Sequence, residues 1–330
     1  MEHSNAGTIN DFVGQLPSVE AAEKIARTLK TKVALGMCTE DDYSSSLYEL
    51  SSAIESDNLQ GDSDDWHNFA INFAQRHDTR EACKILERGL KQHPNSVDLL
   101  GDFLKYGLSC GEEEKCDEYY HKLINMPPVK MTSWRGFDFT IDYLLALFAQ
   151  KNTQEELDEL REHLNARVEQ FKKRFPYEEQ AYLANAEIFL AYGEDDAAAN
   201  ILKEAMDKFA APKCCLKYAD LMLERGEFDE VIDAAQKGIS CSAQEQAGIN
   251  IAYLVYLLAL AKDGKLHSEN AYQDEQRVRD IFRDYQFAQK SFDKSRSSYL
   301  ENLRNRTLLL SMKTGIPYDE AFEDKSDNCE

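Results

Sequence analysis

The chain has 330 residues, and its 38 Lys and Arg against 60 Asp and Glu give a net charge of −22. This balance excludes a protein that binds nucleic acid or anionic membranes through its overall charge. With 43% hydrophobic residues but only 15 Gly and 7 Pro, the chain is neither wholly disordered nor a turn-rich all-β protein. No apolar run reaches the roughly 20 residues of a membrane span, and the first residues lack the basic and apolar regions of a secretory signal. We therefore expect a cytoplasmic protein with free thiols.

The hydrophobic pattern predicts helices almost throughout the chain. Apolar residues recur at intervals of three and four, as at Ala181, Ala184, Ile188 and Ala191. Breaks between helices are expected at Gly36, His93 to Asn95, Gly111, Pro127 with Pro128, Pro176, Gly193, Pro212, Gly226 and Gly264.

The first predicted element is a helix pair at about residues 18–57, within an N-terminal cap of residues 1–62. The acidic run from Glu40 to Asp42 is typical of a helix start, because the helix dipole favours negative charge there. Further along, Thr153 and Glu156 have the spacing of a capping box, which predicts a long helix from Thr153 to about Arg174.

Residues 63–96 contain a two-helix motif. Its apolar and small residues are Trp66, Phe69, Ala70 and Phe73 in the first helix and Ala82, Leu86, Gly89 and Pro94 in the second helix and exit turn. The breaks recur at a matching interval, since Gly193 and Gly226 are 33 residues apart and Pro94 and Pro128 are 34 apart. A period near 34 residues with two helices per unit predicts stacked helix hairpins.

This motif resembles the tetratricopeptide-repeat (TPR) family. Weaker matches follow at 97–130, 179–211 and 212–241, with divergent units at 131–175 and 250–290. The resemblance implies an all-α fold, a right-handed α-solenoid superhelix of about five to seven antiparallel helix pairs with a cap at each end. The array is expected to span 63–264, followed by a basic helical cap at 265–316 and an acidic tail at 317–330 that we expect to be disordered.

The resemblance also implies a concave face, lined by the first helix of each unit, that holds a peptide or a helix of another protein. The residues expected on this face are His67, Ile71, Asp98, Lys105, Leu183, Glu187, Leu190, Lys213, Leu216, Lys217, Asp220, Leu223, Leu254 and Leu258. The second half of the face is the more apolar, which favours an amphipathic segment with basic flanks. Alternatively, tight winding or the C-terminal helices cover these leucines.

One TPR subclass grips the acidic tails of chaperones with Lys, Asn and Arg, and this chain does not meet its pattern. Among the matching positions only Lys217 is basic. An acidic peptide would also meet an already negative protein, so we expect a neutral or basic partner.

The segment 277–306 reverses the local charge. Its candidate interface residues are Arg277, Arg279, Arg283, Lys290, Lys294 and Arg296. Three interpretations remain open: the solvated face of a capping pair, a surface that docks on acidic protein, or a nucleic-acid site, which the interleaved acidic residues weaken.

Catalytic motifs are not convincing. Ser291 to Lys294, Lys313 to Gly315 and Ser326 to Asn328 match the three motifs of penicillin-recognising serine enzymes, but the last two stand in the wrong order and no strand carries them. Cys110, Cys116 and His121 are the best metal candidates, yet their spacing fits no zinc site and a fourth ligand is missing. We expect no catalytic residue, cofactor or metal site.

The sequence therefore predicts a non-catalytic scaffold or adaptor that binds another protein or a peptide segment, and neither a membrane nor nucleic acid. One alternative is a peptide-sensing regulatory receptor. Another is a subunit whose basic C-terminal helices dock an acidic partner or nucleic acid. A homo-oligomer stays open.

Overall fold

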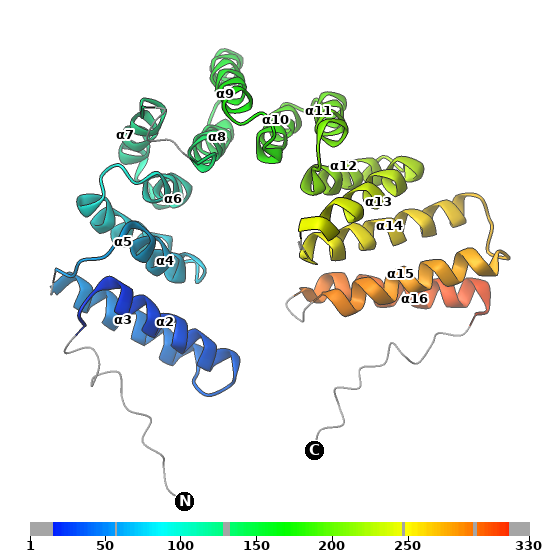
Figure 1. The fold of residues 1–330 in the computed structure, drawn as a ribbon, viewed down its shortest axis with the longest axis horizontal. Coiled ribbons are helices and arrows are strands. Elements are labelled where there is room, and N and C mark those ends of the chain that lie inside the picture. Colours follow the sequence, from blue (N-terminus) through cyan, green and yellow to red (C-terminus); the bar gives the residue numbers. More distant parts are fainter. Residues whose placement is uncertain (1–15, 57, 128–132, 246–247, 293–295, 317–330) are drawn as a thin grey trace, which may run out of the picture. The chain divides into compact units, whose positions relative to one another are not determined.

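The computed structural model describes residues 16–56, 58–127, 133–245, 248–292 and 296–316, and every regular element in these ranges is a helix (Figure 1). The predicted all-α fold is confirmed. The internal contacts divide the chain into two units, Met1–Phe171 and Lys172–Glu330. Predictions about Pro128, Lys294 and residues 317–330 lie outside the described residues.

The first unit holds the predicted N-terminal helix pair and the hairpins that follow it. Its helices are α2 (Val19–Ala34), α3 (Glu40–Ser56), α4 (Ser63–Ala74), α5 (Thr79–Gln92), α6 (Val97–Gly107), the short η1 (Leu108–Cys110), α7 (Glu113–Ile124) and α8 (Arg135–Phe148). The division between the units falls inside α9 (Gln154–Arg174).

The second unit begins with the end of α9 and continues through seven helices. They are α10 (Glu179–Ala191), α11 (Asp195–Lys208), α12 (Pro212–Glu224), α13 (Phe228–Glu245), α14 (Gly248–Ser268), α15 (Glu275–Ser291) and α16 (Ser297–Thr314). None of the helices in the described ranges is long and apolar enough to cross a membrane.

Helices pack in the order of a stacked hairpin array within each unit. Each first helix packs on its hairpin partner, as α4 does on α5 and α12 on α13. It also packs on the helix two places along, as α4 does on α6, α10 on α12 and α12 on α14. A single hairpin cannot bury both faces of its apolar stripe, so this second contact completes the core. The right-handed winding stays a prediction.

Glycines at equivalent places in two hairpins let helices approach closely. A Cβ atom on Gly89 would lie 2.8 Å from Cβ of Trp66, and one on Gly238 would lie 2.8 Å from Cβ of Cys215. Trp66 and Cys215 are both fully buried at these contacts. The period read from the sequence therefore reflects a repeated packing contact.

Most of the predicted helix boundaries agree with the structure. Gly36, Gly111, Gly193 and Gly226 all have positive φ angles between helices. The capping box before α9 is also present, with the backbone N–H of Glu156 donating to Oγ1 of Thr153 at 3.2 Å and the N–H of Thr153 donating back at 3.1 Å.

The predicted break at Gly264 is wrong, because α14 continues through it to Ser268. This glycine answers a packing need instead. The ring of Phe228, at the start of α13, lies 2.5 Å from the place of a Cβ on residue 264. Glycine is therefore required there by the neighbouring ring and does not mark a turn.

Candidate functional site

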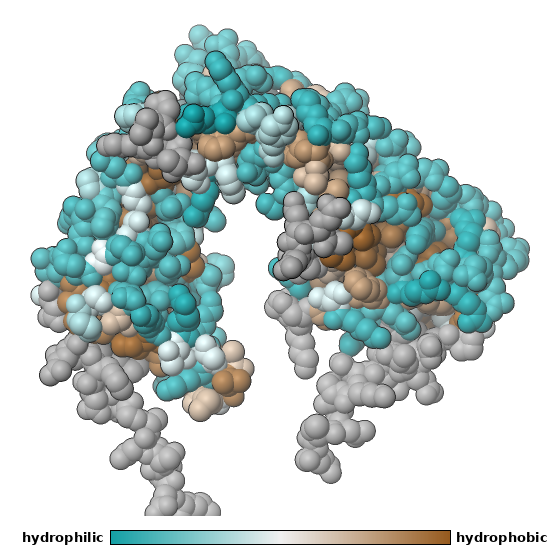
Figure 2. Space-filling model, in the orientation of Figure 1, coloured by the Kyte–Doolittle hydropathy of each residue, from teal (hydrophilic) through white to brown (hydrophobic). Residues whose placement is uncertain are grey.

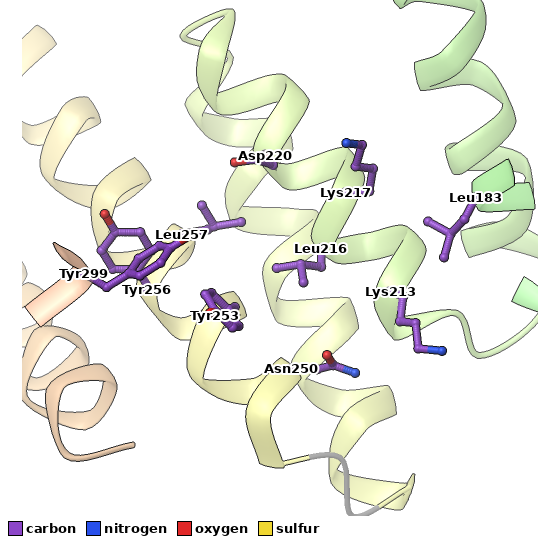
Figure 3. Close-up of a pocket in the computed structure, with 10 residues that line it drawn as sticks. All are labelled: Leu183, Lys213, Leu216, Lys217, Asp220, Asn250, Tyr253, Tyr256, Leu257 and Tyr299. Atoms are coloured by element: carbon purple, nitrogen blue, oxygen red, sulfur yellow. The ribbon is translucent and has the colours of Figure 1, made fainter. Parts of the chain in front are cut away.

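A groove in the second unit is the best candidate site, and we name it the tyrosine groove. It has a volume of about 410 Å³ and takes side chains from α10, α12, α14 and α16 (Figure 3). Its lining residues are Leu183, Lys213, Leu216, Lys217, Asp220, Asn250, Tyr253, Tyr256, Leu257 and Tyr299. Figure 2 shows hydrophobic surface on the flank of this unit where α12 and α14 lie in Figure 1.

The helical period explains why α12 contributes four of these residues. Its opposite face is apolar and enters the core through Cys214, Cys215, Tyr218, Ala219 and Met222. The positions left for the groove are 213, 216, 217 and 220, which share one helix face. On α14 the same rule places Asn250, Tyr253 and Leu257 on the groove side.

An aromatic cluster forms the wall between α14 and α16. The ring centroids of Tyr253 and Tyr299 are 5.3 Å apart, and those of Tyr256 and Tyr299 are 5.5 Å apart, both in edge-to-face geometry. Phe292 completes the cluster, 5.0 Å from Tyr253. Burial raises the pKa of Tyr256, so its hydroxyl stays neutral at physiological pH. The wall is therefore apolar with neutral phenol groups.

The charged residues of the tyrosine groove are only partly compensated. The backbone N–H of Lys213 donates to Oε2 of Glu179 at 3.0 Å, and its Nζ lies 3.4 Å from the other carboxylate oxygen. Lys217 and Asp220 have no ion pair or hydrogen bond with any residue in the described ranges. One positive and one negative group are thus available to a ligand.

Five of the predicted face residues come together here: Leu183, Lys213, Leu216, Lys217 and Asp220. Glu187, Leu190 and Leu223 lie on the same helices outside the lining, Glu187 exposed and the two leucines half-buried. The aromatic wall was not predicted as a site, because Tyr253 and Tyr256 match positions that pack between hairpins in the repeat pattern.

Leu254 and Leu258 are corrections to the predicted face. They are 0% and 6% exposed, and they belong to the core of α14. Leu254 packs where α13 approaches most closely, with its Cδ1 2.9 Å from the place of a Cβ on Gly238. Their helix face meets α13, so neither residue reaches a ligand.

The predicted face residues of the first unit mostly contact one another or their neighbours. Nδ1 of His67 on α4 hydrogen-bonds Asp102 on α6, and this bond raises the pKa of His67. Asp98 forms an ion pair with Arg135 on α8 at 2.8 Å. Ile71 is half-buried and Lys105 is exposed, and neither lines a groove described in this unit. These polar pairs link hairpins and leave little free charge.

The basic residues of α15 are paired as well. Arg277 forms an ion pair with Glu269 at 2.6 Å, Arg283 pairs with Asp280 at 3.2 Å, and Nε of Arg279 donates to Glu275 at 2.9 Å. Lys290 is exposed, and the guanidinium of Arg296 lies 5.8 Å from the ring centroid of Tyr253. The acidic partners offset the three arginines that the sequence had suggested as an interface.

The cysteines in the described ranges are free thiols. Cys116 is buried, with its pKa raised to about 11 by burial, whereas His121 is exposed near Asp117. Sγ of Cys110 lies 4.0 Å from Sγ of Cys83. Within the ranges that the structure describes, no three His, Cys, Asp or Glu side chains form a group that could hold a metal ion.

No protein-family model matches the chain, and no curated protein does. Several solved structures do. The TPR protein TTC0263 of Thermus thermophilus has a TM-score of 0.44 at 19% identity, over 58% of this chain and 96% of that one. Human IFIT1, in a dimer with m7Gppp-AAAA, has a TM-score of 0.41 at 13% identity, over 96% and 72%. Yeast Tom70 has a TM-score of 0.41 at 12% identity, over 88% and 64%.

The chain's own packing defines its fold. Helix hairpins of about 34 residues stack with each first helix against the next first helix. Glycines mark the same close contact in separate hairpins. These features give this chain a tetratricopeptide-repeat fold.

Proposed function

We propose that this chain is a protein-interaction module whose second unit binds a peptide segment of a partner protein in the tyrosine groove. One observation carries the proposal: four successive first-position helices direct apolar, aromatic and uncompensated charged side chains into one groove. Rigid aromatic and aliphatic anchors with a few polar groups are what peptide grooves use for affinity and orientation. The proposal includes no catalytic step.

The apolar floor supplies the affinity in this proposal. Leu183, Leu216 and Leu257 lie between the charged groups of α12 and the aromatic wall (Figure 3). An amphipathic segment would cover these side chains and remove their apolar surface from water, at about 25 cal/mol for each Å² buried. The polar residues at the rim would then set its register.

A selection from a displayed library of random peptides on the full-length protein tests this function. We expect the recovered peptides to bind the native chain and to lose binding to Leu216→Glu, which places a charge in the apolar floor. Leu308→Glu is the matched control, because Leu308 is 52% exposed on α16 and lies outside the groove. Circular dichroism checks that both variants fold. Recovery of no peptide, or equal binding to both variants, would contradict the proposal.

A further inference from the structure

We propose that the tyrosine groove selects a basic segment, with a Lys or Arg side chain placed between Asp220 and the rings of Tyr253, Tyr256 and Tyr299. This inference rests on the proposed function and adds the chemistry of the ligand.

Asp220 is the first reason. Its carboxylate is exposed on the groove face of α12 and has no ion pair or hydrogen bond with a residue in the described part of the chain. It is also close enough to the aromatic wall to contribute to the raised pKa of Tyr256. A cation that reaches the wall therefore meets an unpaired negative group beside it.

The tyrosine rings are the second reason. An aromatic face attracts a cation that lies within about 6 Å of its centroid. The chain's own Arg296 already uses this attraction, with its guanidinium 5.8 Å from the ring of Tyr253. Tyr256 and Tyr299 take part in no such contact among the described residues, although they belong to the same wall. A ligand cation therefore has two further rings available.

Net charge and Lys217 give direction to the ligand. The net charge of −22 attracts a basic segment at long range. Within the groove, Lys217 lies on the side of α10 and the tyrosines lie on the side of α16 (Figure 3). A cation is repelled at the first side and attracted at the second, so the segment binds in one orientation.

The test uses the full-length protein and two labelled synthetic peptides. The first has Leu and Arg residues separated by Ser, and the second replaces each Arg by citrulline, its neutral isostere. We expect the Arg peptide to bind about tenfold more tightly in fluorescence anisotropy, and the difference to shrink at high salt. Asp220→Asn should remove the preference.

Asp233→Asn is the matched control, since Asp233 is an exposed acid on α13 outside the groove and the substitution changes the net charge equally. It should change the affinity by less than about twofold. The inference is overturned if the Arg peptide does not bind the native chain, if citrulline binds equally well, if both Asn variants act alike, or if a Glu peptide binds best. If the library peptides bind through Leu216 but lack Lys and Arg, the proposed function stands and this inference fails.

Discussion

His67 provides a test of how the first unit is held together. Its hydrogen bond to Asp102 joins α4 to α6, and the two side chains are only 18% and 6% exposed. The bond raises the pKa of His67 above its ordinary value of about 6.5, against an opposing desolvation effect. Arg135 also faces the imidazole and lowers its pKa, whereas Asp98 raises it. The net direction favours the charged form in the folded state.

The sign of the pH effect follows from that direction. A pKa that is higher in the folded state means that the folded chain binds the proton more tightly. The stabilisation is fully present below about pH 6.5, the unfolded pKa, and is lost as the pH rises through the folded pKa. A hydrogen bond between charged partners contributes about 1.5–3 kcal/mol, and we expect the lower value because His67 keeps some contact with water.

The perturbation is His67→Gln, and the assay is urea unfolding followed by tryptophan fluorescence. The chain has two tryptophans, Trp66 and Trp134, and both lie in the first unit, so the signal reports that unit. We expect the variant to lose about 1.5 kcal/mol of unfolding free energy near pH 5.5 and clearly less near pH 9. His163→Gln is the control, because His163 is exposed on α9. A loss that is the same at both pH values would refute the reasoning.

Three further predictions concern the second unit. Gly238→Ala should lower the unfolding free energy by about 1–3 kcal/mol, because the new Cβ would lie 2.8 Å from that of Cys215, and an unchanged thermal midpoint would argue against this contact. Leu254→Ala should cost about 2–5 kcal/mol in chemical unfolding, since it empties a fully buried site, whereas a loss typical of a surface position would show that the residue is not core. Burial raises the pKa of Cys215 to about 12 and also raises that of Cys214, so iodoacetamide at neutral pH should label the half-buried Cys110 first; early labelling of Cys215, read by mass spectrometry, would contradict this order.

Local signals in the sequence predict much of the fold. Helix ends at Gly193 and Gly226 and the capping box at Thr153 were predictable, because each depends on neighbours within a few residues. Gly264 has the same sequence signature as a helix end, but its role depends on the ring of Phe228, 36 residues away. A pattern of glycines alone cannot separate these two roles.

The candidate site was predictable only in part. The period of α12 was enough to place Lys213, Leu216, Lys217 and Asp220 on one face. Tyr299 was not predictable, because it comes from α16, whose packing beside α14 is a long-range contact.

The ion pairs of α15 show the same limit. The pairing of Arg279 with Glu275 follows from a spacing of four residues, whereas that of Arg277 with Glu269 depends on a turn between two helices. A count of basic residues along the sequence therefore overstated the positive charge of this surface.

The contact between Gly264 and Phe228 has an evolutionary consequence. The two positions share one volume, so neither can change freely while the other stays fixed. A relative of this chain with alanine or a larger residue at position 264 should carry a smaller side chain at position 228. Paired exchanges at these sites, in sequences otherwise similar, would be the imprint of this single steric constraint.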